Sequence, residues 1–400
     1  MVEFVIGSIF VAGLALAALG WRLRNRIESR DPRPGTRRRA FAALALGAVA
    51  CITAGTMAMR AWFPQPTAIA AATDGASSGT REKAVPGLAD GLPEPYPAPD
   101  FAGIAAWINS PPLTMAGLRG KVVLVDFWTY SCINCVRTLP QLAAWDRKYR
   151  RDGLVIVGVH SPEFRFETRR KNVQAAVARY GIRYPVALDS SLRTWSNFHN
   201  LVWPAHYLID RRGRVVSTHF GEGRYDVTEN DIRLLLGLRG KVGPDGAPQP
   251  ISLVQTPETY LGALRAERFA GAPAITDGAS RNDRFPSTLA PDSWALRGRW
   301  SVGSQKISAL APGAAIRLRF TARKVFLVLG TASGDPVRAS IRLNGAPPQG
   351  SAGRDAPGGT LRITRDTLYE LIDQGAVRDG VIEIVADQPG VEAYAFTFGS

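Results

Sequence analysis

Two cysteines, Cys132 and Cys135, are the residues whose type and spacing best suit chemistry. They end the run Val122–Cys135, which starts as an apolar stretch rich in β-branched residues and breaks just before a Cys-Ile-Asn-Cys motif. Apolar residues then recur at helical spacing, so a strand, a tight loop and a helix starting at the motif are predicted. The unpaired N–H groups and positive dipole end of that helix favour a thiolate at Cys132. Cys135, one turn further in, could attack a mixed disulfide on Cys132.

The other uses of a cysteine pair fit this sequence less well. The third cysteine, Cys51, lies apart in an apolar run, and there is no second CxxC to complete a four-ligand metal site. Haem attachment needs a histidine after the motif, where Val136 stands. A structural disulfide across so short a loop stabilises little. A redox pair with no metal and no further cofactor is therefore predicted. The four histidines are isolated in sequence, at His160, His199, His206 and His219.

Acidic and aromatic residues near the motif are candidate partners. Asp126, in the strand before the motif, is expected beneath Cys135, where its carboxyl could take or give the proton of that thiol; a strand-end acid reaching water is the alternative. Glu163 follows a strand end and could shuttle protons, or it could be a solvated acid at a helix start. Tyr130 and Trp203 could line the substrate groove or pack at its rim.

Residues 101–238 are predicted to form an α/β unit with a central mixed sheet and helices on both faces. Trp203-Pro204 precedes a predicted strand. A cis proline there would bring backbone near the sulfurs, where an extended substrate could pair with it, whereas an ordinary loop proline is the alternative. The predicted strands are 122–128, 154–159, 184–188, 206–210 and 214–220, and the predicted helices cover about 133–150, 166–180 and 227–238.

The C-terminal part has a different pattern. Residues 239–269 are predicted to be a linker, and residues 270–400 a β-sandwich, because short runs of alternating apolar and polar residues are separated by turns. Such runs include 316–320, 325–329 and 337–343. Four aromatic residues could form a platform for sugar or belong to the core, namely Trp294, Trp300, Tyr369 and Tyr394.

The N-terminal part predicts a membrane anchor. Residues about 4–21 and 40–59 carry no charge, and each is long enough to cross a bilayer as a helix. The arginine-rich loop between them should stay cytoplasmic, which places the C-terminal part on the other side. A cleaved export signal is the alternative, and it too exports the rest of the chain. Residues 64–100 hold seven prolines and are predicted to be a linker.

The positive charge of the chain does not indicate nucleic-acid binding. The formal net charge is +15, but residues 22–39 alone hold eight arginines against two acids. The remaining excess is spread thinly, without a basic stripe interleaved with aromatic residues. Nucleic acid is therefore not an expected partner.

Several segments resemble a known family. The motif, Asp126, Pro140 and Trp203-Pro204 together look like a thioredoxin fold of the membrane-tethered TlpA/ResA branch. The similarity is closer still to the thioredoxin-like region of DipZ-type proteins, where a β-sandwich resembling a carbohydrate-binding module follows. The resemblance implies Cys132 as nucleophile, Cys135 as resolving thiol, Pro204 as the cis proline and Asp126 as the buried acid. The segments that carry it are FWTYSCINCVRTLP, GVHSPEFRFE, WPAHYLID, HFGEGRYD and TPETYLG.

The chain departs from that family in two respects. DipZ proteins commonly begin with a multi-span electron-transfer domain, whereas only two spans and Cys51 are predicted here, so electrons would come from a separate membrane donor such as a CcdA/DsbD-like protein. The dipeptide between the cysteines is Ile-Asn, not Gly-Pro, which leaves the direction of electron flow open. Cytochrome c maturation is a client pathway by family analogy only.

The sequence therefore predicts a thioredoxin fold followed by an all-β, jelly-roll-like sandwich, behind N-terminal transmembrane helices. The expected function is that of a thiol:disulfide oxidoreductase, anchored in the inner membrane and facing the periplasm, which exchanges disulfides with protein substrates and acts more as a reductase than as an oxidase. The rival hypothesis is a cell-envelope adaptor that binds glycan or protein through the sandwich, with the CxxC secondary.

Overall fold

A computed structural model describes residues 84–243 and 255–399. The described residues belong to one compact unit, which contains two β-sheets. The predicted spans 4–21 and 40–59, and Cys51 with them, lie outside the described residues. Within the described ranges, no helix combines the length and the apolar character needed to cross a membrane.

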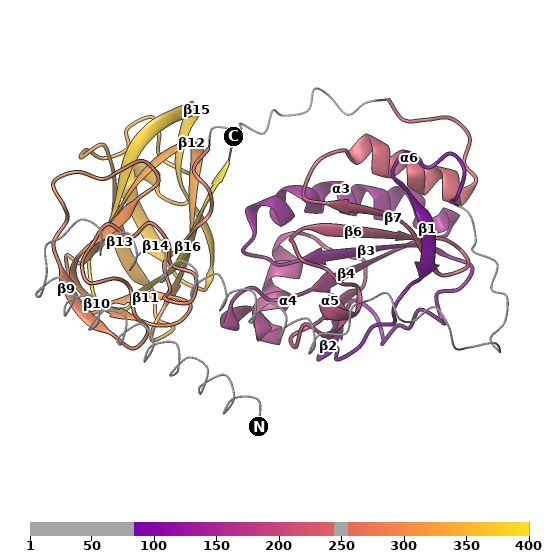
Figure 1. The fold of residues 1–400 in the computed structure, drawn as a ribbon, viewed down its shortest axis with the longest axis horizontal. Helices are drawn as coiled ribbons and strands as arrows, with labels where there is room; N and C mark the ends of the chain where they lie inside the picture. Colours follow the sequence, from indigo (N-terminus) through magenta and orange to yellow (C-terminus); the bar gives the residue numbers. More distant parts are fainter. Residues whose placement is uncertain (1–83, 244–254, 400) are drawn as a thin grey trace, which may run out of the picture. The chain divides into compact units, whose positions relative to one another are not determined.

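The first sheet is mixed, as the sequence predicts. Its seven strands stand in the order β1-β7-β6-β3-β4-β5-β2 (Figure 1). The pairs β3–β4 and β4–β5 are parallel, and all other pairs are antiparallel. The strands are β1 (Gly91–Pro97), β2 (Ala106–Ile108), β3 (Val122–Trp128), β4 (Leu154–His160), β5 (Val186–Leu188), β6 (Ala205–Ile209) and β7 (Arg214–Phe220).

Three longer helices, α3, α4 and α6, pack on one face of this sheet, on the side of Val122, Leu124 and Trp128. Strands β3, β4 and β5 follow one another in the sheet, so right-handed crossovers place α3 and α4 on the same face. The other face is covered by residues 98–118 and the short helix α5. The sequence predicts helices on both faces, and on this face the structure has the single short helix α5 among the described residues. The helices are α3 (Ile133–Tyr149), η1 (Arg150–Asp152), η2 (Arg165–Thr168), α4 (Arg170–Arg179), α5 (Arg193–Asn197) and α6 (Tyr225–Leu236).

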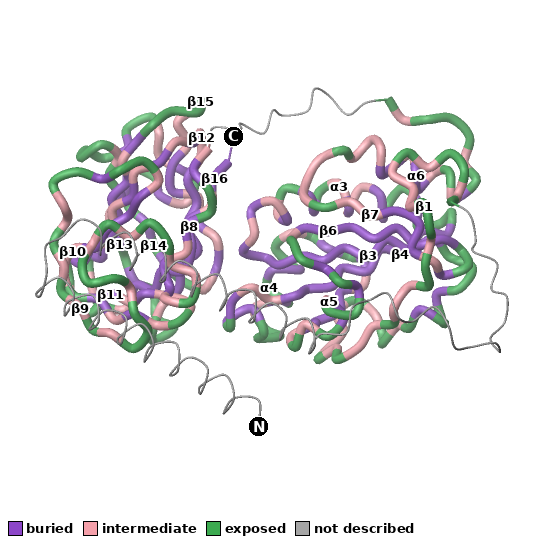
Figure 2. Tube along the Cα trace, in the orientation of Figure 1, coloured by how far each residue is buried: buried purple, intermediate pink, exposed green. Residues whose placement is uncertain are grey.

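Strand β3 is the centre of the first sheet and is buried along its whole length (Figure 2). Because successive side chains point to opposite faces of a strand, Val122, Leu124, Asp126 and Trp128 share the face covered by α3. One carboxyl thus stands in an otherwise apolar row, directly below the helix that begins at the CxxC motif.

Two strands occur where linkers are predicted. β1 lies within the proline-rich residues 64–100 and pairs with β7 at the sheet edge. Edge strands tolerate proline, because one side of the strand needs no ladder hydrogen bonds. β8 (Thr259–Tyr260) lies within 239–269 and pairs with β16 of the second sheet.

In the second sheet all the strand pairs are antiparallel. It has nine strands: eight stand in the order β14-β13-β15-β12-β10-β11-β16-β8, and β9 pairs with β10 beside this path. The long β12 pairs with β10 through its first part, with β16 through its last part, and with β15 along most of its length. The predicted runs 316–320 and 325–329 both belong to β12. The buried apolar side chains of these strands form one hydrophobic core. The remaining elements are β9 (Ser280–Asp283), β10 (Trp294–Val302), β11 (Ile307–Ala309), β12 (Ala315–Thr331), β13 (Val337–Leu343), η3 (Pro357–Gly359), β14 (Thr360–Ile363), β15 (Thr367–Ala386) and β16 (Val391–Gly399).

Candidate active site

The two cysteines lie where β3 passes into α3. β3 ends at Trp128, and Cys132 is the N-cap residue of α3, with its Sγ accepting the backbone N–H of Cys135 at 3.5 Å. Both cysteines are free thiols in this structure. An acceptor at this position satisfies one of the unpaired N–H groups of the first helical turn, and a thiolate is the better acceptor of the two sulfur forms.

The two thiols have different surroundings. Cys132 is partly exposed, whereas Cys135 is 1% exposed. Burial raises the pKa of Cys135 well above its ordinary value, and the adjacent Cys132 and the charge of Asp126 raise it further. Cys132 is therefore the thiol that a substrate can reach, and Cys135 needs a proton acceptor before it can react.

Asp126 is a candidate for that acceptor. It is 1% exposed on the α3 side of β3, and its cross-strand neighbour on β6 is His206. The Nε2 of His206 lies 3.2 Å from Oδ1 of Asp126, although the alignment is not that of a hydrogen bond. His206 in turn pairs in register with His219 on β7, with ring centroids 6.0 Å apart. Burial and the neighbouring His206 lower the pKa of His219.

The row formed by Asp126, His206 and His219 is not evident from the sequence. The sequence pattern predicts the strands that carry the three residues, but the histidines are isolated in sequence. Periodicity assigns a residue to a face, whereas the pairing register that brings these side chains together is set in three dimensions.

Glu167 is a further residue whose place at the site is not evident from the sequence. It is 1% exposed, and its Oε1 accepts hydrogen bonds from Oγ of Ser131 at 2.6 Å and from the backbone N–H of Ser131 at 3.3 Å. Its Oε2 accepts the backbone N–H groups of Glu163 and Phe164. Burial raises the pKa of Glu167, partly offset by these donors. This carboxyl fixes the residue that precedes Cys132. Nothing in the spacing of GVHSPEFRFE distinguishes it from a solvated acid.

Glu163 is bound to residues of the second sheet. Its Oε1 accepts hydrogen bonds from Arg265 at 2.8 Å and from the hydroxyl of Tyr260 at 2.7 Å. The Glu163 side chain is 8% exposed. The contact joins the loop after β4 to β8 and the segment that follows it. A proton-shuttle role for Glu163 stays a prediction.

Pro204, Trp203 and Tyr130 lie around the motif. The Trp203–Pro204 peptide bond is cis, as the sequence resemblance implies. Since β6 runs antiparallel to β3, Pro204 stands at the end of the sheet where β3 leads into the motif. Trp203 is half-buried and donates from Nε1 to the carbonyl of Ser161 at 3.0 Å. Tyr130 is 1% exposed and stacks on His160, so it forms interior wall and is closed to a substrate at the surface.

Two ligand hypotheses can be examined against the described residues. Within residues 84–243 and 255–399, no group of three or more His, Cys, Asp or Glu residues is placed to hold a metal ion. The four aromatic residues suggested as a sugar platform are all buried, so the alternative that they belong to the core is correct. Their exposed fractions are Trp294 0%, Trp300 1%, Tyr369 6% and Tyr394 5%. A buried ring cannot stack on a sugar.

The fold and the placement of the two thiols are those of a thioredoxin-like thiol-disulfide oxidoreductase. Residues 96–218 match the AhpC/TSA family, and residues 256–399 match the family described as thioredoxin-like C-terminal domain. The chain is 37% identical over 319 residues to Protein DipZ of Mycobacterium bovis, covering 76% of this chain and 43% of DipZ. It is 30% identical over 127 residues to the thiol-disulfide oxidoreductase YkuV of Bacillus subtilis, covering 32% of this chain and 84% of YkuV.

The chain belongs to the thioredoxin-like thiol-disulfide oxidoreductases and is of the DipZ type. A solved thioredoxin-like protein in its oxidised form aligns with 28% identity and a TM-score of 0.34, covering 36% of this chain and 96% of its own. The chain spans less than half the length of the DipZ proteins that it matches. Enzymes of this class work through a redox-active cysteine pair and need no external cofactor.

Proposed function

We propose that the chain exchanges disulfides with protein substrates through Cys132 and Cys135, and that it acts as a reductase on the extracytoplasmic side of the inner membrane. The observation that carries the proposal is the asymmetry of the pair. One thiol is partly exposed at the helix start, and the other is buried, with a pKa that burial and the charge of Asp126 raise. Such a pair attacks with one sulfur and resolves with the other.

In the reductive direction the chemistry has two steps. The Cys132 thiolate attacks one sulfur of a substrate disulfide, the substrate S–S bond breaks, and the first substrate thiolate leaves. Cys135 then gives its proton to Asp126 and attacks Sγ of Cys132. The mixed disulfide breaks, the second substrate thiolate leaves and is protonated, and the Cys132–Cys135 disulfide forms. The substrate gains the two electrons that the cysteine pair loses.

Membrane anchoring and the electron source belong to the same proposal. The uncharged runs 4–21 and 40–59, with the arginine-rich loop between them, support an inner-membrane anchor with the described residues in the periplasm. In an oxidising compartment a reductase must be re-reduced, so the proposed partner is a separate CcdA/DsbD-like membrane donor. The proposed substrates are proteins with thiols or disulfides.

Trapping of mixed disulfides tests the exchange. The full chain carrying Cys135→Ser should accumulate covalent adducts with cellular proteins, because the resolving thiol is gone, and the adducts should disappear on reduction. The matched variant Cys132→Ser should form none, since Cys135 is buried. Absence of adducts from the Cys135→Ser protein, or equal yields from both variants, would contradict the proposal.

The reduction potential of the pair tests the direction. A strongly negative value favours the reductase, and a value near that of DsbA, about −120 mV, favours an oxidase. The measurement is the equilibrium of the full chain in detergent with glutathione buffers. The oxidase result would leave disulfide exchange standing and reverse only its direction.

A further inference from the structure

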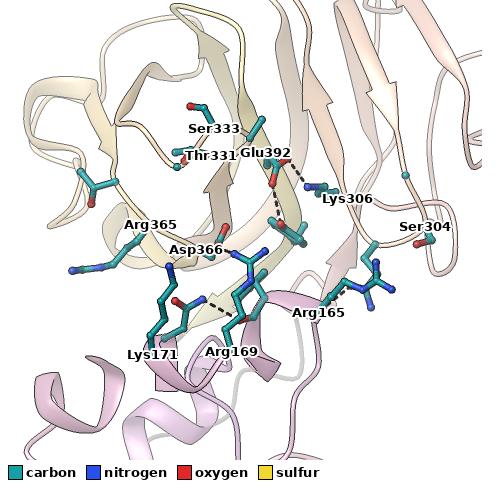
Figure 3. A pocket seen from close by; sticks show the side chains of 18 residues that line it. Arg165, Arg169, Lys171, Ser304, Lys306, Thr331, Ser333, Arg365, Asp366 and Glu392 are labelled. Carbon is teal, nitrogen blue, oxygen red and sulfur yellow. Dashed lines mark hydrogen bonds and ion pairs between the residues drawn. The ribbon is translucent and has the colours of Figure 1, made fainter. Parts of the chain in front are cut away.

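A basic cavity lies apart from the cysteine pair, between η2–α4 and three turns of the second sheet. Its volume is about 800 Å³. The turns join β10 to β11, β12 to β13, and β14 to β15. Five cationic residues and two acids line it (Figure 3), namely Arg165, Arg169, Lys171, Lys306, Arg365, Asp366 and Glu392.

Both acids in the basic cavity are already neutralised. Glu392 is buried, forms an ion pair with Lys306 and accepts a hydrogen bond from the hydroxyl of Tyr394 at 3.1 Å. Asp366 lies 3.9 Å from Arg169, which reaches across from the start of α4 (Figure 3). The acids therefore offset two of the five cations.

The other three cations, Arg165, Lys171 and Arg365, have no ion-pair partner among the described residues. They come from η2, from α4 and from the turn before β15, so the fold gathers them from distant parts of the chain. All three side chains are exposed around the cavity. A concave surface lined by charges of one sign focuses the electric field and raises the local concentration of counter-ions, which is the physical reason to expect an anion here.

The remaining lining suits a polar ligand with more than one charged group. Hydroxyl and amide side chains also line the cavity, including Ser304, Thr331, Ser333 and Asn172. The cavity volume lies within the range of small-molecule sites, about 300–1,000 Å³. A single small anion would fill only part of such a volume. Charge-assisted hydrogen bonds to carboxylate or phosphate are the strong contacts that arginine and lysine provide.

We propose that the basic cavity binds a small polyanion carrying two or more carboxylate or phosphate groups. The ligand bridges the α4 side, through Lys171, and the second-sheet side, through Arg365. This binding is independent of disulfide exchange, so it can be present or absent whatever the Cys135→Ser trapping experiment shows.

Calorimetric titration of the full chain in detergent, at low ionic strength, tests the proposal with pyrophosphate and citrate as probes. Saturable binding of either probe is expected, and the preferred one identifies phosphate or carboxylate as the recognised group. Lys171→Glu and Arg365→Glu should each weaken binding about tenfold or more, since each loses a charge-assisted contact and gains a repulsive charge.

Matched controls separate the basic cavity from the general positive charge of the chain. Arg170→Glu and Arg362→Glu make the same change of charge at exposed residues outside the lining, and they should alter affinity by less than about twofold. The milder Arg365→Gln covers the case in which a charge reversal unfolds the protein, and it should still weaken binding. The proposal is overturned if neither probe binds saturably, or if the controls weaken binding as much as the cavity variants.

Discussion

Asp126 and Cys135 are the two residues between which we propose a proton transfer at the centre of the first sheet. The Asp126 carboxylate raises the pKa of the buried Cys135 thiol because like charges disfavour the thiolate. The same carboxylate is the proton acceptor that we propose for the resolving step. In this proposal the buried Cys135 is protonated at rest, and Asp126 accepts its proton when the thiol attacks the mixed disulfide.

The effect of Asp126 on Cys135 can be measured in a chain with one thiol at the site. In a Cys132→Ser background, Asp126→Asn should lower the pKa of Cys135, because the replacement removes the nearby negative charge. Titration of thiolate absorbance against pH reports the pKa. Ser217→Ala, in β7 and away from the thiol, is the control and should leave it unchanged. An unchanged or raised pKa in the Asp126→Asn chain would show that the carboxylate does not act on this thiol.

Glu167 gives a pH dependence of stability with a defined sign. Burial raises its pKa in the folded protein above the ordinary value of 4.5, so the folded state binds more protons than the unfolded state between 4.5 and the raised pKa. The free energy of unfolding must fall as pH rises through that window. Relative to Glu167→Gln, the native chain should therefore lose stability with rising pH there.

Urea unfolding of the two proteins across this pH range measures the difference. Glu167→Gln should also show a loss of about 1–3 kcal/mol at all pH values, because an amide cannot accept from all the donors around this carboxylate. Glu267→Gln, at an exposed acid, is the control and should show neither effect. A difference that grows in favour of the native chain as pH rises would contradict the assigned sign.

At the scale of elements, the sequence located most of the first sheet. β3 and β7 have the bounds that alternation and apolar runs predict, and α3 ends one residue earlier than predicted. The motif placed Cys132 at the start of that helix. These features are local, because composition and periodicity within a short window determine them.

The features that could not be predicted from the sequence depend on contacts between segments that are distant in the chain. The pairing of Asp126 with His206 requires the register of β3 against β6, and the role of Glu167 requires η2 to fold back on the loop before Cys132. In the second sheet, residues 321–324 contain no glycine or proline, so β12 continues where two strands were expected. Tertiary pairing there outweighs the weak local signal.

Gly158 tests how tightly β4 packs beside the site. It is the parallel neighbour of Asp126, and a Cβ there would lie 3.0 Å from Nε1 of Trp128 and 3.1 Å from Cε2 of Tyr184. Both rings are at most 1% exposed and cannot move freely. Gly158→Ala should lower the free energy of unfolding by about 1–3 kcal/mol, as overpacking of a core does.

Denaturant unfolding measures the loss at Gly158. Gly303→Ala is the matched control, because a Cβ at Gly303 meets its nearest neighbour at 3.5 Å, an ordinary contact. If Gly158→Ala is as stable as the control protein, the rings of Trp128 and Tyr184 move to make room for the methyl group. The packing around Asp126 is then looser than the distances indicate.

At the scale of the whole described unit, Glu163 connects the loop after β4 to the second sheet. Its contacts with Arg265 and Tyr260 span about a hundred residues of sequence and join segments from the two family matches. The sequence suggested a proton shuttle for Glu163, whereas these contacts favour a role in holding the two sheets together.

The two roles of Glu163 lead to different outcomes for Glu163→Gln. If the residue joins the sheets, the free energy of unfolding should fall by about 1–3 kcal/mol, because a buried charge-assisted contact is lost, while the rate at which Cys135 resolves a mixed disulfide stays the same. Arg265→Gln should cause a similar loss. The double variant should be little worse than either single one, since the partners share one interaction. Urea unfolding and single-turnover release of a thiol from a Cys132 mixed disulfide measure the two quantities. A slowed release with unchanged stability would instead establish the proton shuttle, because only that role links the Glu163 carboxyl to the chemistry of the thiols.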